Sequence, residues 1–300
     1  MNRNLLLAFV AILLITNIMT LIFWRQGDMV SLDENDTKIN QKDPVAAVGD
    51  QAISYEEWTA SLRANYGKKQ LEKLINQRAV EQLAAKNNIT IDEKVIEREL
   101  ALLRTMQGVM TEEEANQKEQ EWRRAIIYRY QLQALLTDDV DIPDEKVRTH
   151  YEEFQDQYNV QATTQISHIV VEDTETAEKV HEELENGASF DLLAREYSID
   201  EATKSDGGYF EFLVNSSQFW PEGYLDKTKE MDERTYSEPF RVNQGVAIIY
   251  LHQKLPAIMF EYDEIKPYIT QELAMDELGN ELSADPLWNE LNIDWIYKKE

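Results

Sequence analysis

A long apolar run near the N-terminus is the feature that most constrains this chain. Residues 5–24 read LLLAFVAILLITNIMTLIFW and contain no charged side chain. A helix of about 20 residues is long enough to cross a hydrocarbon core of about 30 Å. A cleaved secretory signal has a shorter apolar core that ends in small residues, whereas this run ends in Ile22-Phe23-Trp24. We therefore expect residues 1–24 to form a short cytoplasmic tail and an uncleaved transmembrane signal anchor.

The flanking charges bear on the orientation of that anchor. Arg3 precedes the run and Arg25 follows it, so the local count of positive charges favours neither side strongly. A tail of only four residues is readily retained inside. The expected localisation is the cell membrane, with a single pass and the body of the protein on the extracytoplasmic side.

Composition excludes several classes of function. The chain has 57 acidic and 30 basic residues, a formal net charge of −27 and no cysteine. The electrostatic field of this negative charge repels nucleic acid and anionic lipid surfaces. The simplest role of these charges is to keep the part of the chain after residue 24 well solvated. The absence of cysteine excludes disulfides, thiol catalysis and cysteine–zinc sites. We find no histidine pair at metal-ligand spacing and no phosphate-binding glycine motif, so we expect no metal, no cofactor and no nucleic-acid partner.

Apolar periodicity divides the rest of the chain. Residues 25–43 are polar and aperiodic, as in a linker. Residues 44–160 begin with a short extended segment and a helix capped by Ser54, and further apolar stripes at helical spacing follow. The box Thr111-x-x-Glu114 predicts the start of one of these helices. This region is therefore expected to be a helical domain.

The period changes from helical to extended at residues 165–171, which read QISHIVV. Helices near 174–186 and 190–197, a glycine loop and a strand at 246–251 would complete an α+β unit over residues 161–254. Residues 255–300 are helical again and are expected to pack on residues 44–160 as one discontinuous domain. The predicted fold class is α+β, with an N-terminal transmembrane helix and a helical domain that flanks the α+β unit.

Several short motifs in the α+β unit occur together in a recognisable order. They are Ser167-His168-Ile169-Val170-Val171, ASFDLLAREYSID at 188–200, Gly207-Gly208, Ser237-Glu238-Pro239-Phe240 and Gly245-Val246-Ala247-Ile248-Ile249. In this order they resemble the parvulin family of peptidyl-prolyl isomerases. The flanking segments PVAAVGDQAISYEEW and LEKLINQRAVEQLAAKNNITIDE resemble the chaperone domain of the PrsA and SurA folding factors.

The resemblance implies a membrane-anchored extracytoplasmic foldase with peptidyl-prolyl cis-trans isomerase activity. Its partners would be unfolded or partly folded exported polypeptides and their X–Pro segments, and a homodimer is left open. The rival interpretation is a non-catalytic holdase or assembly chaperone with a degenerate parvulin domain. A third is a purely structural anchored protein, which would not bind unfolded chains.

The resemblance also implies site residues. His168 would be the first of two facing histidines, and Asp200 occupies a position where family members carry Asp or Cys. The cup for the proline ring would draw on Phe212, Trp220 and Tyr224. Without the resemblance, His168 is an ordinary strand histidine, Asp200 a turn residue and the aromatics core residues.

One position departs from the family pattern. Ala247 stands where the second histidine is expected, and the glycine loop is shorter than usual. His252 follows five residues later, and this odd offset puts it on the other face of a regular strand, about 17 Å along. We therefore expect weak isomerase activity, which an imidazole at position 247 would raise.

Overall fold

The computed structural model describes residues 29–31, 38–279 and 281–297. The predicted anchor at 5–24 lies outside these residues. Among those described, no helix combines the length and the apolar character that a membrane span requires. The described residues divide into two compact units, one of those up to residue 78 together with 293–297 and one of those between 79 and 292. Each is described by itself below.

The first unit consists of two small hairpins followed by helix. Ser54 caps the first helix as predicted, because its hydroxyl accepts a hydrogen bond from the Glu57 N–H at 3.1 Å. Gly49 turns the second hairpin with a φ of +59°, a conformation that glycine adopts without strain. The elements are β1 (Met29–Ser31), β2 (Lys38–Asn40), β3 (Pro44–Val48), β4 (Gln51–Ser54), α2 (Tyr55–Leu62), the π-helix η1 (Arg63–Gly67) and the start of α3 (Lys68–Lys86).

The second unit contains a helical part built from segments on both sides of the α+β region. Thr111 and Glu114 form the predicted capping box at the start of α5, and their backbone and side-chain groups bond reciprocally. The elements are the end of α3, α4 (Glu93–Thr105), α5 (Glu112–Thr137), α6 (Asp144–Tyr158), α10 (Tyr262–Leu278) and the 3-10 helix η3 (Asp285–Glu290).

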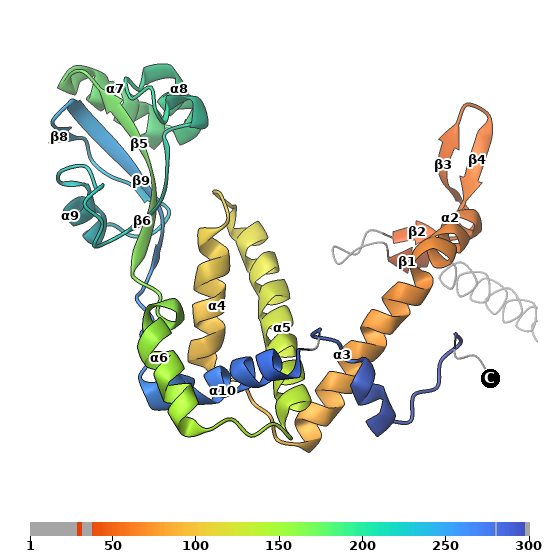
Figure 1. The fold of residues 1–300 in the computed structure, drawn as a ribbon. Coiled ribbons are helices and arrows are strands. Elements are labelled where there is room, and N and C mark those ends of the chain that lie inside the picture. The colour runs from red at the N-terminus through yellow and green to blue at the C-terminus, as the bar shows by residue number, and fades with distance from the viewer. Residues whose placement is uncertain (1–28, 32–37, 280, 298–300) are drawn as a thin grey trace, which may run out of the picture. The chain divides into compact units, whose positions relative to one another are not determined.

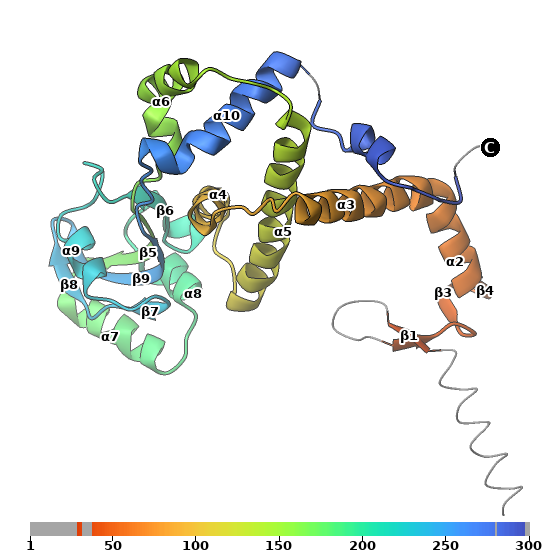
Figure 2. The same cartoon turned by 90° about the horizontal axis from the view of Figure 1, so that it is seen from below.

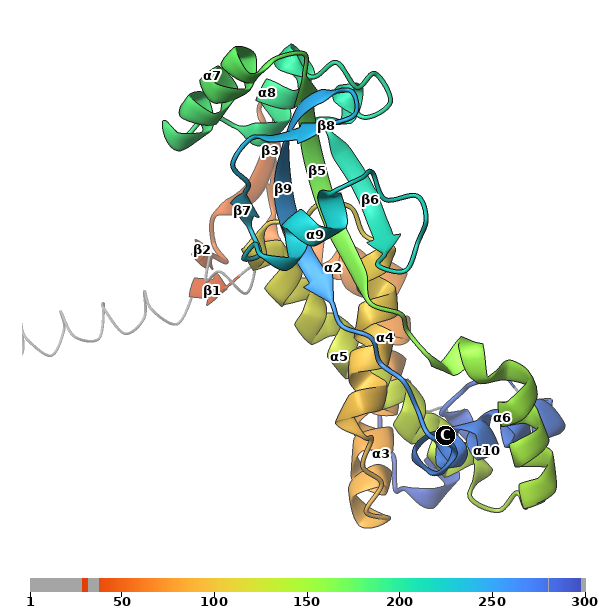
Figure 3. The same cartoon turned by 90° about the vertical axis from the view of Figure 1, so that its left-hand side faces the viewer.

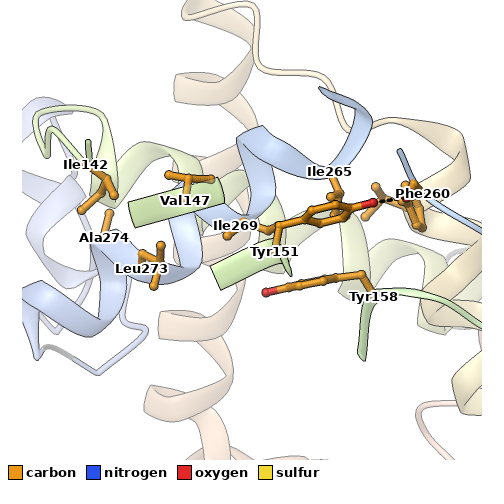
Figure 4. Close-up of a cluster of buried hydrophobic side chains, with 10 residues drawn as sticks. Ile142, Val147, Tyr151, Tyr158, Phe260, Ile265, Ile269, Leu273 and Ala274 are labelled. Carbon is orange, nitrogen blue, oxygen red and sulfur yellow. Dashed lines mark hydrogen bonds between the residues drawn. The ribbon is translucent and has the colours of Figure 1, made fainter. Parts of the chain in front are cut away.

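Helices α6 and α10 are distant in sequence but share one core (Figure 2). Figure 4 shows the buried side chains of that core, among them Val147 and Tyr151 from α6 and Ile269 from α10. The Tyr151 hydroxyl donates a hydrogen bond to the Phe260 carbonyl at 2.8 Å. The chain therefore leaves the helical core at the end of α6 and returns to it at Phe260.

Between these two points lies an antiparallel sheet, drawn at the upper left of Figure 1. Strand β5 pairs with β6 and β9, and β9 also pairs with β7 and β8. The strands are β5 (Thr163–Val171), β6 (Tyr209–Val214), β7 (Thr235–Tyr236), β8 (Phe240–Val242) and β9 (Gly245–Leu255). The helices are α7 (Thr174–Glu185), α8 (Phe190–Tyr197), the 3-10 helix η2 (Lys204–Asp206) and α9 (Tyr224–Lys229). The predicted α+β class is confirmed for the described residues.

The two faces of this sheet have different coverings, and Figure 3 views the face on which α9 lies. Because side chains alternate along a strand, Ile169 and Val171 of β5 point to the face that α7 and α8 cover. Ile166 and Val170 point to the other face, where they pack with Tyr224 at the start of α9. His168 lies between Ile166 and Val170 on this second face.

Candidate active site

His168 is held in the middle of β5 by its backbone. It pairs with Ile249 of β9, and its N–H donates to the Gly208 carbonyl at 2.8 Å. A Cβ added at Gly208 would lie 2.0 Å from the His168 carbonyl oxygen, and the φ of Gly208 is +77°. Only glycine fits there, so the glycine loop of the sequence has a direct part in fixing His168.

His168 is 4% exposed, and both nitrogens of its imidazole are hydrogen-bonded. Its Nδ1 lies 2.9 Å from the Tyr224 hydroxyl. Its Nε2 lies 2.8 Å from Asp200 Oδ2 and 2.8 Å from the Thr203 hydroxyl. The Thr203 hydroxyl in turn donates to Asp200 Oδ2 at 2.6 Å. The structure thus brings His168 and Asp200, both predicted as site residues, into direct contact.

Burial and hydrogen bonding set the charges in this network. Burial lowers the pKa of His168, and the neighbouring Asp200 only partly opposes that effect. Burial alone would raise the pKa of Asp200, but hydrogen bonds from Thr203 and His168 outweigh it and hold that pKa below its usual value. Burial, followed by the charge of Asp200, raises the pKa of Tyr224. At neutral pH the network therefore contains a neutral imidazole, a carboxylate and a phenol.

An apolar surface surrounds the imidazole. The Phe210 ring lies 5.2 Å from the His168 ring, edge to face. The Trp220 indole N–H donates to the Val214 carbonyl at 3.0 Å, which fixes the orientation of that side chain. The neighbours of His168 on this face, Ile166, Val170 and Tyr224, belong to one buried cluster. Five half-buried residues pack against that cluster: Phe210, Trp220, Met231, Phe240 and Val242. These five side chains are called the apolar cup below.

The predicted cup residues do not all lie at His168. Trp220 borders the cup, whereas Tyr224 is 2% exposed and reaches His168 through its hydroxyl. Phe212 packs elsewhere, against a cluster that contains Ala101, Val160 and Leu255. This packing places Phe212 against a second cluster, and its part in binding a proline ring stays a prediction.

A register shift explains the difference. Ile166 pairs with Phe210 and Gln165 pairs with Phe212, with the irregularity of the ladder between Gln165 and Ile166. Because of this shift, Phe210 and Phe212 pack against different clusters, and Phe210 is the one that lies beside His168. Sequence reasoning missed Phe210 and also Thr203, whose only local signal is its position three residues after Asp200.

Ala247 and His252 occupy opposite faces of β9. Ala247 is fully buried on the face of His168, opposite Val170 of β5 and Phe240 of β8. His252 lies on the other face, where its Nε2 is 2.8 Å from the Ser167 hydroxyl. Burial lowers the pKa of His252 to about 4. The sequence argument that His252 points away from the site agrees with this position.

A cavity of about 460 Å³ lies on the face of the sheet opposite His168. His252 and Tyr250 line it from the sheet, and Trp122 lines it from α5. An ion pair between Arg234 and Glu112, at 2.6 Å, joins two of its lining residues. This cavity is separate from the apolar cup. Within the described part of the chain, no group of acidic or histidine side chains could hold a metal ion.

Comparisons with known proteins identify the family. The sequence model of the PPIC-type PPIASE domain matches residues 142–267, which include the whole sheet and the His168 network. YacD of Bacillus subtilis (strain 168), which carries a provisional peptidyl-prolyl cis-trans isomerase name, is 37% identical over 254 residues. The match covers 84% of this chain and 85% of YacD. This chain belongs to the parvulin family of PPIC-type peptidyl-prolyl isomerases. The resemblance stated from the sequence is confirmed.

Foldases named PrsA are further relatives of this parvulin. PrsA of Caldanaerobacter subterraneus subsp. tengcongensis is 31% identical over 211 residues, which are 69% of this chain and 62% of that protein. Among solved structures, PrsA of Bacillus cereus aligns over 86% of this chain and 96% of its own, with 20% identity and a TM-score of 0.33.

Proposed function

We propose that this parvulin is a peptidyl-prolyl cis-trans isomerase that acts on X–Pro segments of unfolded exported polypeptides. The observation that carries the proposal is the buried imidazole of His168, bonded to Asp200 and Tyr224 and bordered by the apolar cup. A buried polar network beside a half-exposed apolar surface matches what the reaction requires.

Rotation about an X–Pro bond meets a barrier of about 18–20 kcal/mol and takes tens to hundreds of seconds without a catalyst. No covalent bond needs to form. Rotation breaks the resonance of the planar imide, so the twisted form has less charge separation and is favoured by a surface that excludes water. A thousandfold acceleration needs only about 4 kcal/mol of preferential stabilisation of the twisted form. The ring of the substrate proline would bind against Phe210 and Trp220, with the imide facing His168.

The cellular setting is part of the same proposal. The uncharged run at 5–24 supports a single-pass membrane anchor with the body on the extracytoplasmic side. The relatives named foldase protein PrsA support a role in protein folding. The expected partners are therefore exported chains that have not yet folded.

The second candidate is a non-catalytic holdase, and two observations favour it. Ala247 replaces the second histidine of the family pattern, and the 460 Å³ cavity offers a surface away from His168. A holdase would bind unfolded chains without changing the rate of X–Pro rotation.

An isomerisation assay of the full chain in detergent, with a proline-containing peptide, separates these functions. We compare wild type with His168→Ala and with His252→Ala, which removes a half-buried histidine from the other face of the same sheet. Isomerase function predicts a rate above the uncatalysed one that falls with His168→Ala and persists with His252→Ala. A folded wild type without activity, or equal loss in the two variants, would refute the catalytic assignment.

A further inference from the structure

Tyr224 contacts His168 at the nitrogen that Asp200 does not reach. Its hydroxyl lies 2.9 Å from Nδ1, while Asp200 and Thr203 both lie at Nε2. We infer that Tyr224 is a positioning residue, whose hydroxyl donates to Nδ1 and holds the imidazole in the tautomer that carries its proton on Nε2. Only the consequence for turnover rests on the proposed function. The assignment of the tautomer does not.

The inventory of donors and acceptors leads to one arrangement. An ionised Asp200 can only accept hydrogen bonds, and the single proton of Thr203 is directed at Asp200 Oδ2. Nε2 therefore faces two acceptors and must itself carry a proton. In a neutral imidazole Nδ1 is then an acceptor, so the Tyr224 hydroxyl must donate to it.

The opposite tautomer is disfavoured by the same distances. With the proton on Nδ1, the lone pair of Nε2 would face a carboxylate oxygen 2.8 Å away with no proton between them. Asp200 would also lose one of the hydrogen bonds that hold its pKa down. Burial makes such an unpaired contact costly, because water cannot replace the missing partner.

Packing fixes the phenol in the position to donate. Tyr224 is the first residue of α9 and follows Gly223, whose φ of +82° directs the chain into the helix. Its ring lies 5.5 Å from that of Phe240 and 5.7 Å from that of His168, both edge to face. Ala247, fully buried, belongs to the same cluster. A large residue on α9 and a small one on β9 thus share one core, and the ring that reaches His168 comes from the helix.

Tyr224→Phe is the direct test because it removes the hydroxyl and keeps the ring. We expect the isomerisation rate to fall about two- to tenfold, as for the loss of one hydrogen bond in the reactive state. Peptide affinity should change less than about twofold, because the apolar surface is retained. Tyr209→Phe is the matched control. Its hydroxyl accepts from Gln165 in the same sheet and does not contact His168.

Nitrogen NMR of ¹⁵N-histidine-labelled full chain in detergent reads the tautomer directly. His168 is assigned by loss of its signals in His168→Gln. The expected result is a protonated Nε2 and an unprotonated, hydrogen-bonded Nδ1 in wild type and Tyr209→Phe, with the Nδ1 shift displaced in Tyr224→Phe. A proton on Nδ1 in wild type, or unchanged His168 shifts in Tyr224→Phe, would overturn the inference.

Two further outcomes are also decisive. If Tyr224→Phe does not fold, the wild-type tautomer and a correlation between the Tyr224 hydroxyl proton and His168 Nδ1 decide the question alone. If the nitrogen shifts behave as expected but the folded wild type does not isomerise proline peptides, Tyr224 keeps its positioning role and the proposed function fails.

Discussion

The backbones of Gly208 and His168 approach so closely that a Cβ at Gly208 would lie 2.0 Å from the His168 carbonyl oxygen. The same two residues share a backbone hydrogen bond of 2.8 Å. Gly208 therefore fixes the distance between β5 and the loop that carries Thr203. Because Thr203 contacts Nε2 of His168, the orientation of the His168 imidazole depends on glycine at position 208.

Gly208→Ala is expected to destabilise the protein by about 2 kcal/mol or more, because it combines left-handed strain with a clash against backbone. Gly187→Ala is the control. The φ of Gly187 is +87°, but a Cβ there would meet nothing within 4 Å. We therefore expect Gly187→Ala to lower the free energy of unfolding by about 1 kcal/mol, from backbone strain alone. Urea unfolding of both variants measures the difference. Equal losses would mean that the close approach contributes nothing.

Acid is expected to destabilise the sheet through His252 and His168, whose pKa values are both lowered. Burial lowers the pKa of His252 from 6.5 to about 4, so between these values the unfolded chain binds the proton more readily. The corresponding stability is fully present above about pH 6.5 and is lost as the pH falls towards 4. His168, with a lowered pKa, acts in the same direction.

The contribution of His252 is isolated by His252→Gln, which keeps a polar group at the position that bonds to the Ser167 hydroxyl. The free energy of unfolding should fall less in the variant than in wild type between pH 7 and pH 5, by about 1–2 kcal/mol. Urea unfolding at pH 7, 6 and 5 measures this difference. The comparison cancels the protonation of the many surface carboxylates, which is shared by both proteins. Parallel pH profiles would contradict the assignment.

Ala247→His is expected to destabilise the protein by about 1–3 kcal/mol without raising the isomerisation rate. The sequence alone predicted a gain, but Ala247 is fully buried in the same core cluster as Tyr224. In a double-mutant cycle with Tyr224→Ala, the two substitutions should compensate in part, since one removes the volume that the other adds. Additive losses would show that the two positions do not compete for the same space.

The excised α+β unit should fold alone, but its ends matter. A fragment of residues 161–254 removes Leu255 from β9 and omits the pair of backbone hydrogen bonds between Val160 and Ile258, at 2.9 and 2.8 Å. A fragment of residues 159–259 retains them. We expect a cooperative thermal transition in both, at a temperature at least about 4 °C higher in the longer one. Circular dichroism measures both transitions. A disordered longer fragment would refute independent folding.

Local interactions explain what the sequence determined by itself. The caps at Ser54 and Thr111 bond to residues three positions away, and the change of period at 165–171 reflects alternation along one strand. The family and the α+β class followed from such patterns and from the motifs that carry the resemblance, which also implied His168 and Asp200 as site residues. None of these depended on the register of one strand against another.

Only the tertiary structure decided which aromatic residues lie beside His168. The register shift between Gln165 and Ile166 brings Phe210 to His168 and leaves Phe212 in another cluster. Tyr224 was predicted as a surface for proline, yet its hydroxyl binds a histidine 56 positions away in sequence. Spacing along the chain cannot reveal this contact, because it depends on how α9 packs against the sheet.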